Sequence, residues 1–356
     1  DVDNVAPVAD RLAAAVAPGD AGDPQRSRDD YRAERRAGPK PGEERSYGGI
    51  RTYRAPSELG GKPVTELVLF DVVPAATQGT DAVAVRVETG DLSDRATVDA
   101  LIAPRPDVIF HLAAIVSGEA EADFDKGYRI NMDGTRNLLE AIRAQPGYHP
   151  RVVYTSSIAV FGAPFPEAIG DEFFTTPMTS YGAQKMIGEL LLNDYSRRGI
   201  LDGVGIRLPT IVVRPGKPNK AASGFFSGII REPLAGIEAV LPVDDSVRHW
   251  VASPASATGF LIHAATMDTA PLGARRCMTM PGLSVTVGEM IAALGEVAGP
   301  DKVALIKRQP DATIRGIVAG WPRNFDAARA TAAGFVADAS FQDIIRAHIR
   351  DMDTAG

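Results

Sequence analysis

The sequence has 356 residues, a length that suits two domains or one large α/β domain with a smaller lobe, because domains average about 150 residues. Hydrophobic residues make up 45% of the chain and charged residues 23%, a balance typical of globular proteins. The 38 basic residues are outnumbered by 45 acidic ones, and the net charge is −7. This argues against a nucleic-acid partner, because affinity for a polyanion needs a clustered basic face.

The cysteine and histidine content argues against disulfides and against a metal site. Cys277 is the single cysteine, and the five histidines show no paired metal-ligand spacing. We therefore expect no metal and a reducing compartment, the cytoplasm. The chain has no apolar run near the ~18 residues that cross a bilayer and no signal-peptide pattern, so we expect no membrane partner.

Residues 1–58 form an atypical polar leader. Between Asp20 and Tyr47 there is no Val, Ile, Leu, Met, Phe or Trp. A stretch of this composition cannot bury enough apolar surface to offset its ordering entropy. We expect the leader to be poorly ordered and the folded part to begin near Leu59.

From Leu59 onward, short β-rich apolar runs alternate with helical stretches, which predicts a parallel sheet with helices on both faces. The expected strands are residues 66–73, 83–88, 108–112, 151–156 and 204–213. The expected helices between them are residues 94–103, 131–144 and 180–197. The pattern predicts a Rossmann-like, doubly wound α/β domain over residues 59–216.

Beyond residue 216 the composition shifts to helices joined by Pro- and Gly-rich loops, with one or two isolated strands. Ser253-Pro254 favours a helix start, because Ser can cap and Pro is tolerated at the first helical position. Further helices are expected at residues 286–298, 325–333 and 341–352. We expect residues 217–356 to form a smaller, mostly helical substrate lobe over the carboxyl edge of the sheet, some of whose helices could return to the sheet.

The strongest candidates for chemistry are Ser157, Tyr181 and Lys185. Four residues are about one helical turn, so Tyr181 and Lys185 share a helix face. A free phenol has a pKa of about 10, and an ammonium beside it favours the phenolate, which could exchange a proton with a substrate hydroxyl or carbonyl. Ser157, at the end of a strand, could hold the same oxygen. This setting favours a catalytic role over a surface Tyr and Lys pair.

Several residues at strand ends are candidates for a dinucleotide site. Asp71 could accept hydrogen bonds from an adenosine ribose and so favour NAD over NADP, although a strand-ending turn also explains an aspartate there. The run Gly90-Asp91-Leu92 could meet the adenine edge, and the small residues in His111-Leu-Ala-Ala114 let the backbone approach a flat cofactor. We expect His111 itself to hydrogen-bond within the core.

The remaining candidates are Asn131, two residues of a predicted strand, and three arginines. Asn131 is explained by helix capping almost as well as by a functional role. Pro209 and Thr210 could pack against the nicotinamide. A substrate carboxylate could pair with Arg214, Arg231 or Arg248, since a guanidinium fork matches its two oxygens, but each arginine could equally be a solvated surface residue.

These motifs together resemble the extended short-chain dehydrogenase/reductase family, which includes the NAD-dependent epimerases and dehydratases. The resemblance runs from about Gly60 to the C-terminus. Within the family, residues 113–125, 189–199 and 207–219 are similar to dehydrogenases of a four-carbon sugar acid. The resemblance implies NAD-dependent oxidation of a C2 hydroxyl to a 2-oxo acid, and a homodimer formed through the helices that carry Asn131 and Tyr181.

The resemblance also implies roles for individual residues. Tyr181 would be the catalytic base, Lys185 would lower its pKa and anchor a ribose, and Ser157 would donate to the substrate oxygen. The implied cofactor site comprises Asp71, Asp91, Leu92, Leu112, Ala113, Ala114, Asn131, Thr155, Tyr181, Lys185, Pro209 and Thr210. The implied sugar-acid site comprises Ser117, Gly118, Ser157, Tyr181, Arg214 and Asn219.

One element of the family pattern has no counterpart in this sequence. The family opens with a strand and a Gly-x-x-Gly-x-x-Gly turn, whose backbone amides meet the pyrophosphate at a helix N-terminus. Two alternatives therefore stay open beside the dehydrogenase. One is an NAD-dependent sugar-nucleotide epimerase or dehydratase, which would need a cleft of basic and aromatic residues that we do not find. The other is an inactive homologue with an impaired NAD site.

Overall fold

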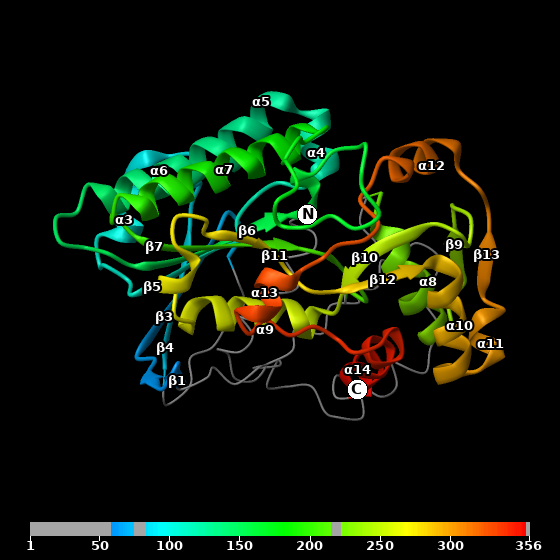
Figure 1. Cartoon of the computed structure of the whole chain (residues 1–356). Helices are drawn as coiled ribbons and strands as arrows, with labels where there is room; N and C mark the ends of the chain where they lie inside the picture. The colour runs from blue at the N-terminus through cyan, green and yellow to red at the C-terminus, as the bar shows by residue number, and fades with distance from the viewer. Residues whose placement is uncertain (1–57, 75–82, 215–221, 354–356) are drawn as a thin grey trace.

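A computed structural model describes residues 58–74, 83–214 and 222–353 (Figure 1). Apart from Glu58, the predicted polar leader lies outside these ranges, and so does Asn219. Within them, every helix is too short or too polar to span a membrane.

The main sheet has four parallel strands in the order β11-β7-β6-β5. Strands β5 (Val108–His111), β6 (Arg151–Ser157) and β7 (Asp202–Leu208) were predicted from the sequence. Strand β11 (Cys277–Thr279) comes from the C-terminal part of the chain. Helices cover both faces, as Figure 1 shows with α7 above the sheet and α9 below it. The predicted parallel α/β architecture is confirmed.

A second parallel pair, β3 (Glu66–Asp71) and β4 (Ala84–Thr89), also follows the prediction. Among the described residues no strand ladder joins this pair to β5. The interior residues of β3 and β4 are only half-buried, whereas β6 is buried along nearly its whole length. Before β3, an antiparallel hairpin joins β1 (Glu58–Leu59) to β2 (Lys62–Pro63). Its turn residues Gly60 and Gly61 have φ of 60° and 74°, which glycine adopts without strain.

The helices above the sheet differ from the prediction in one place. Helix α3 (Arg95–Ile102), capped by Asp94, and helix α7 (Ser180–Arg197), capped by Thr179, match the expected segments. The expected helix at 131–144 begins instead with a π-helical stretch, η2 (Tyr128–Asp133), and continues as α6 (Gly134–Arg143). Two short helices that the sequence did not reveal, α4 (Ser117–Ala122) and α5 (Phe124–Gly127), precede it.

The strand predicted at 204–213 is interrupted at Pro209, because proline has no N–H to donate to a ladder. Strand β7 ends at Leu208, and β8 (Thr210–Ile211) joins a different sheet, with the order β12-β10-β8. The other members of that sheet are β10 (Arg248–Ala252) and β12 (Leu283–Thr286). The chain therefore leaves the main sheet at this proline and pairs next with β10, a strand from the C-terminal part of the chain.

The C-terminal lobe holds more strands than expected. Within the described residues it contributes β9 (Ala239–Leu241), β10, β11, β12 and β13 (Ile306–Arg308), where one or two isolated strands were predicted. These strands are short and their partners are distant in sequence, so little periodic signal marks them. A strand, β11, also returns to the main sheet.

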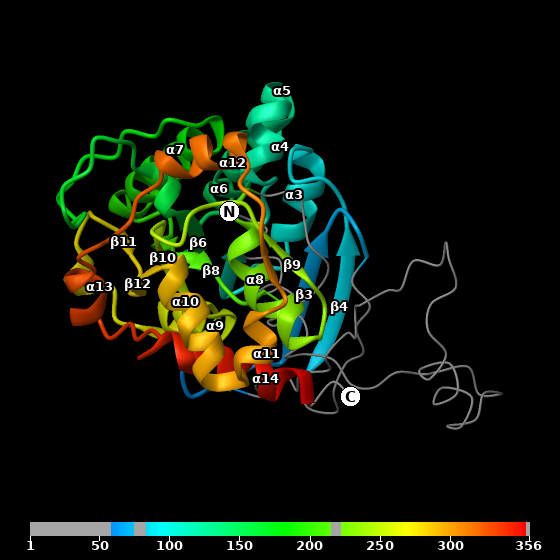
Figure 2. The same cartoon turned by 90° about the vertical axis from the view of Figure 1, so that its right-hand side faces the viewer.

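The helices of the lobe agree better with the sequence. Helix α9 (Pro254–Thr266) begins as predicted, because the Ser253 side chain accepts a hydrogen bond from the Ser256 amide at 3.0 Å. Helices α10 (Val287–Ala298) and α14 (Phe341–Asp353) match their predictions, whereas α13 (Ala328–Ala332) is shorter than expected. Figure 2 shows α10 and α14 side by side with α8 (Gly224–Leu234), where they share one apolar core. Two further helices are α11 (Pro300–Val303) and α12 (Ala312–Ala319).

Candidate active site

The end of β6 and the start of α7 bring the predicted catalytic residues into one buried region. Ser157 is the last residue of β6, and its Oγ accepts a hydrogen bond from the Ala159 amide at 3.2 Å. Tyr181 and Lys185 lie in the first turns of α7, and the side chains of all three residues are buried. Helix α7 packs directly on β6 and on the 3-10 turn η3 (Ile158–Val160) that follows it.

Two glycines of α7 allow this close packing. A Cβ at Gly182 would lie 2.3 Å from the Ala159 carbonyl oxygen, and a Cβ at Gly188 would lie 2.2 Å from the Tyr154 hydroxyl oxygen. A glycine inside a helix costs about 1 kcal/mol relative to alanine. Both glycines lie on the face of α7 that packs on β6 and η3, where a larger residue would clash.

Lys185 is held at the centre of the region. Its Nζ donates to the Thr155 carbonyl oxygen at 2.8 Å and lies 5.7 Å from the centroid of the Tyr181 ring. Burial lowers the pKa of Lys185 to about 7, while the charge of Glu189 acts in the opposite direction. When protonated, this ammonium stabilises negative charge on a nearby phenol, which is the chemistry that a tyrosine base needs.

A chain of hydrogen bonds supports the floor of the site. The Thr155 hydroxyl donates to the His111 carbonyl at 3.1 Å, and His111 Nε2 lies 2.8 Å from the Thr135 hydroxyl oxygen. Because that hydroxyl donates its proton to the Asn131 carbonyl, we assign the Nε2 proton to His111. Burial lowers the pKa of His111 to about 3, so the ring is neutral and takes a structural place in the core.

Asn131 lies inside η2 rather than at a helix N-cap, and its side chain is engaged within the protein. Its Oδ1 accepts from the Ile115 amide at 2.7 Å, while Nδ2 donates to the Ile115 carbonyl at 3.2 Å and to Gln184 Oε1 at 2.7 Å. Asn131 therefore fixes the backbone that follows β5 and ties it to α7. That backbone carries Leu112, Ala113 and Ala114, and Ala113 is exposed.

The predicted adenosine-side residues lie at the ends of β3 and β4. Asp71 is exposed at the end of β3, and its Oδ1 accepts from the Val73 amide at 3.2 Å. Asp91 accepts from the Ser93 amide at 2.8 Å and from Arg129 at 2.8 Å. These hydrogen bonds, the backbone bond from Ser93 above all, lower the pKa of the Asp91 carboxyl. The Leu92 side chain is buried in the core beside α6.

These residues suit the two ends of a dinucleotide but supply only part of its site. Asp71 offers an exposed carboxylate of the kind that binds ribose hydroxyls, and Lys185 offers a cation for the ribose at the other end. Within the described ranges no Gly-x-x-Gly-x-x-Gly turn precedes a helix. The residues present therefore fit the ribose ends, and the pyrophosphate lacks its usual cradle in the described part of the chain.

The predicted substrate residues are less closely gathered. Ser117 is half-buried in the first turn of α4, and Gly118 beside it is exposed with open space around it. Arg214 is buried, with its backbone amide donating to Ser227 Oγ at 3.2 Å. Asn219 falls outside the described residues.

The other candidates of the lobe have partners inside the fold. Arg231 donates to the Arg214 carbonyl at 2.9 Å, and Arg248 donates to the Ser284 carbonyl at 2.7 Å. Thr210 is buried, and its hydroxyl oxygen lies 2.6 Å from His249 Nε2. His249 Nδ1 faces the Pro322 carbonyl, so Nδ1 carries the proton and Thr210 donates to Nε2. Pro209 is also buried.

Sequence reasoning missed a buried ion pair beneath the site, between Glu189 of α7 and Arg207 of β7. Two signals could have revealed it. Arg207 stands in an otherwise apolar strand, and Glu189 follows Lys185 by one helical turn.

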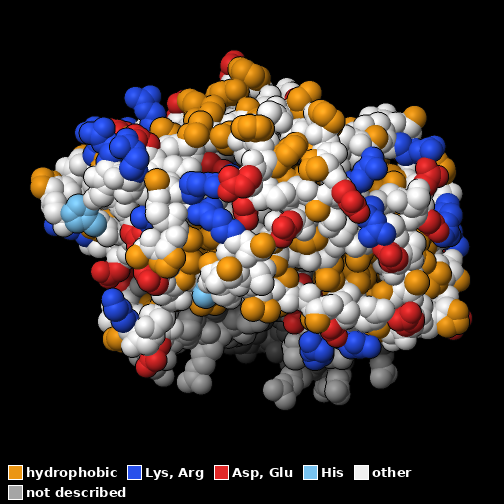
Figure 3. Space-filling model, viewed as in Figure 1, with side chains coloured by type: hydrophobic (Ala, Val, Ile, Leu, Met, Phe, Trp, Pro, Cys, Tyr) orange, Lys and Arg blue, Asp and Glu red, His pale blue; other side chains and the backbone are white. Residues whose placement is uncertain are grey.

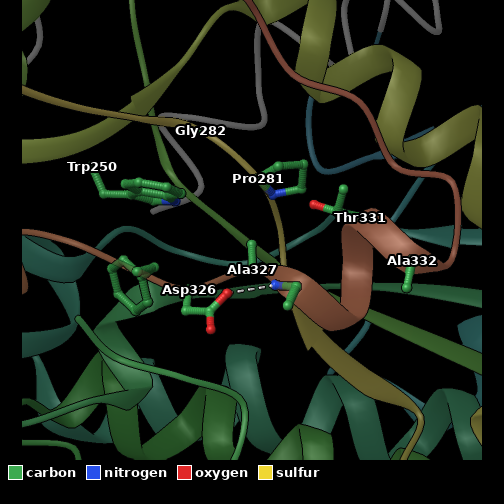
Figure 4. A pocket seen from close by; sticks show the side chains of 9 residues that line it. Trp250, Pro281, Gly282, Asp326, Ala327, Thr331 and Ala332 are labelled. Carbon is green, nitrogen blue, oxygen red and sulfur yellow. Dashed lines mark hydrogen bonds between the residues drawn. The ribbon is translucent and has the colours of Figure 1, made fainter.

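A separate apolar cavity of about 540 Å³ lies on the C-terminal lobe, among Trp250, Pro281 and residues of the α13 region (Figure 4). It contains none of the predicted site residues. Its carboxylate, Asp326, accepts a hydrogen bond from the Ala328 amide at 3.0 Å, just before α13. In the described part of the chain, no cluster of His, Cys, Asp and Glu could hold a metal ion.

Comparison with known proteins identifies relatives along most of the chain. A D-erythronate dehydrogenase from Cupriavidus necator is 49% identical over 304 residues, which cover 85% of this chain and 93% of that protein. A D-erythronate dehydrogenase from Haemophilus influenzae is 44% identical over 288 residues, which cover 80% of this chain and 90% of the relative.

Comparison with solved structures also finds relatives that cover most of the chain. The crystal structure of a nucleoside-diphosphate-sugar epimerase from Agrobacterium tumefaciens is 60% identical, with a TM-score of 0.82 over 84% of this chain and 89% of that one. An L-threonine dehydrogenase from Cupriavidus necator shares the fold at 23% identity, with a TM-score of 0.70 over 80% of this chain and 90% of that one. The sequence model of the NAD dependent epimerase/dehydratase family matches residues 58–271, and the chain belongs to this family.

Proposed function

We propose that this protein is an NAD-dependent dehydrogenase that oxidises the C2 hydroxyl of a small sugar acid, D-erythronate or a close analogue, to the 2-oxo acid. Two relatives that are 44–49% identical bear the name D-erythronate dehydrogenase. The observation that carries the proposal is the buried Lys185 ammonium, which lies beside the Tyr181 ring and is held by the Thr155 carbonyl.

In this proposal the protein moves one proton and orients one hydroxyl. The Ser157 hydroxyl donates a hydrogen bond to the C2 oxygen, and the Tyr181 phenolate takes up the proton of the C2 hydroxyl. Lys185, when protonated, stabilises that phenolate. Asp71 would hold the adenosine ribose and Lys185 the nicotinamide ribose, and bound NAD⁺ would accept the hydride from C2.

The direct test measures NADH formation from D-erythronate and NAD⁺ by the purified full chain. We expect activity in the wild type and its loss in Tyr181→Phe, which removes only the phenolic oxygen. Tyr128→Phe, on η2, serves as the control. Equal activity in wild type and Tyr181→Phe would refute the assignment of the base.

A second candidate is epimerisation of a nucleoside-diphosphate sugar, which is favoured by the name of the Agrobacterium relative. Incubation with UDP-glucose and chromatography of the products separates the two reactions, because an epimerase interconverts sugars without net NADH formation.

A third candidate, an inactive homologue, is tested by calorimetric titration with NAD⁺. Binding at micromolar concentration excludes it, and no binding at millimolar concentration supports it.

We also propose that two copies associate through the face formed by α5 and α7. Figure 3 shows hydrophobic side chains gathered over these helices. Phe124 on α5 is 57% exposed and Leu190 on α7 is 56% exposed, so this face offers apolar surface that a second copy would bury. The molar mass from light scattering should correspond to a dimer, and Leu190→Asp should shift it to a monomer.

A further inference from the structure

A buried charged cluster lies directly behind the candidate catalytic residues. Ser156 is 2% exposed, Glu189 1% and Arg207 9%. Arg207 Nε donates to Glu189 Oε1 at 2.9 Å, and Nη2 donates to Oε2 at 2.7 Å, so the ion pair is bidentate. The Ser156 hydroxyl donates to Oε1 at 2.5 Å. The carboxylate thus receives hydrogen bonds from two strands of the main sheet.

The cluster connects the elements that present the catalytic groups. Ser156 precedes Ser157 on β6 and pairs in register with Arg207 on β7. Glu189 lies one turn after Lys185 on α7. The Arg207 guanidinium also stacks over the Phe161 ring at 5.1 Å, just beyond η3. A shift of α7 along β6 would break these contacts, so the cluster fixes the register between the two elements.

The same carboxylate sets the charge around Lys185. The titratable groups that face the Lys185 ammonium are Tyr181 and Glu189 from α7, Tyr154 from β6 and His111 from β5. His111 is neutral, because burial lowers its pKa to about 3. Burial also raises the pKa of Tyr154 well above its ordinary value, so this phenol stays neutral. Glu189 is the anionic member of the group, and its charge opposes the fall that burial imposes on the pKa of Lys185.

We propose that Glu189 is a positioning residue: bound by Arg207 and Ser156, its carboxylate holds α7 in register on β6 and stabilises the ammonium form of Lys185 beside Tyr181. Glu189 does not touch the substrate in this account. It acts through Lys185, and its effect on turnover rests on the proposed function.

The first experiment needs no activity. In the full chain labelled with ¹⁵N at the lysine side chains, Lys185 is assigned by comparison with Lys185→Arg and titrated by NMR. We expect the pKa of Lys185 to fall in Glu189→Gln and to stay at its wild-type value in Asp194→Asn, which removes an exposed ion pair of the same helix with Arg197. An unchanged Lys185 titration in Glu189→Gln would overturn the proposal.

A double variant keeps the test decisive if Glu189→Gln fails to fold, since the single change leaves Arg207 buried without its counter-charge. The double variant Glu189→Gln/Arg207→Gln removes both charges, so neither side chain leaves an uncompensated charge in the core. If the pair is only structural, this variant regains both the wild-type melting temperature and the wild-type Lys185 titration. If the proposal holds, it melts near the wild type while the pKa of Lys185 stays lowered.

The second experiment uses NADH formation and so depends on the proposed function. In Glu189→Gln we expect kcat at pH 7.5 to fall at least about tenfold, because the general base is weakened. The acid limb of the pH profile of kcat should move to higher pH. KM should change far less. A change in KM alone would overturn the proposal. If the wild type forms no NADH, the proposed function fails, whereas the NMR titration still decides the role of Glu189.

Discussion

The Tyr154 hydroxyl donates to the Lys185 carbonyl at 3.3 Å, and it reaches α7 only because the neighbouring residue 188 is a glycine. A methyl group at Gly188 would come 2.2 Å from the phenol oxygen. The packing of β6 on α7 beneath the candidate site therefore leaves no room for a side chain at position 188.

Gly188→Ala should destabilise the protein. The added methyl forces Tyr154 or α7 to move, and overpacking of this kind costs about 1–3 kcal/mol. Gly259→Ala, in α9, is the matched control, because open space surrounds that glycine. There the higher helix propensity of alanine should stabilise the protein by up to about 1 kcal/mol. Urea unfolding measures both, and equal effects would contradict the packing argument.

Lys185 should make stability depend on pH. Its pKa falls from 10.5 to about 7 on folding, so between these values the unfolded chain binds a proton that the folded chain lacks. Raising the pH through this window therefore stabilises the wild type relative to Lys185→Met, by up to about 1.4 kcal/mol per pH unit. Urea unfolding of both proteins at pH 7, 8 and 9 measures the difference. A difference that is constant with pH would show that Lys185 stays charged in the fold.

Asn131→Ala should loosen the backbone that follows β5. The Ile115 amide and carbonyl would lose their shared partner, so hydrogen exchange at Ile115 should accelerate and NAD⁺ affinity should weaken. Asn131→Asp keeps the acceptor for the Ile115 amide and should retain more of its protection. Asn137→Ala is the control, because Asn137 bonds instead to the carbonyls of Leu92 and Ser93. Equal protection of Ile115 in wild type and Asn131→Ala would refute this role.

Ser157→Ala should lower kcat for NADH formation by roughly 10²-fold, the usual effect of removing one donor to a reacting oxygen. NAD⁺ affinity should stay near its wild-type value, because Ser157 is assigned to the substrate. Ser180→Ala, in the first turn of α7, should leave both quantities nearly unchanged. A loss of NAD⁺ affinity equal to the loss of kcat would place Ser157 at the cofactor instead.

The sequence predicted the parts of this fold that depend on local patterns. A buried strand leading to Ser157 and a long helix carrying Tyr181 and Lys185 were both found where expected. The break at Pro209 could also have been foreseen, because proline cannot continue a central ladder. The assignment of individual residues to cofactor and substrate stays a prediction, as does the domain division at residue 216.

The features that escaped prediction depend on contacts between distant segments. Asn131 looked like a helix cap because nothing in a short run signals a π-helical turn, and its partners Ile115 and Gln184 lie far away in sequence. The pair of Glu189 with Arg207 depends likewise on how α7 docks on the sheet. Periodicity reports which face of an element is buried, but it does not report which partner it meets.

Among the described residues, the β3–β4 pair shares no strand ladder with the main sheet, and this has a consequence for how the protein opens. A two-stranded ladder with half-buried side chains has little stability of its own. Its amides should exchange with solvent through a low-energy local opening, while the amides of β6 and β7 exchange only through global unfolding. On this expectation, Asp71 and Lys185, which are assigned to opposite ends of one dinucleotide, stand on two separate cooperative units. A ligand that bridges them would slow exchange in β3 and β4 far more than in β6, and would thereby couple two foldons that open independently in its absence.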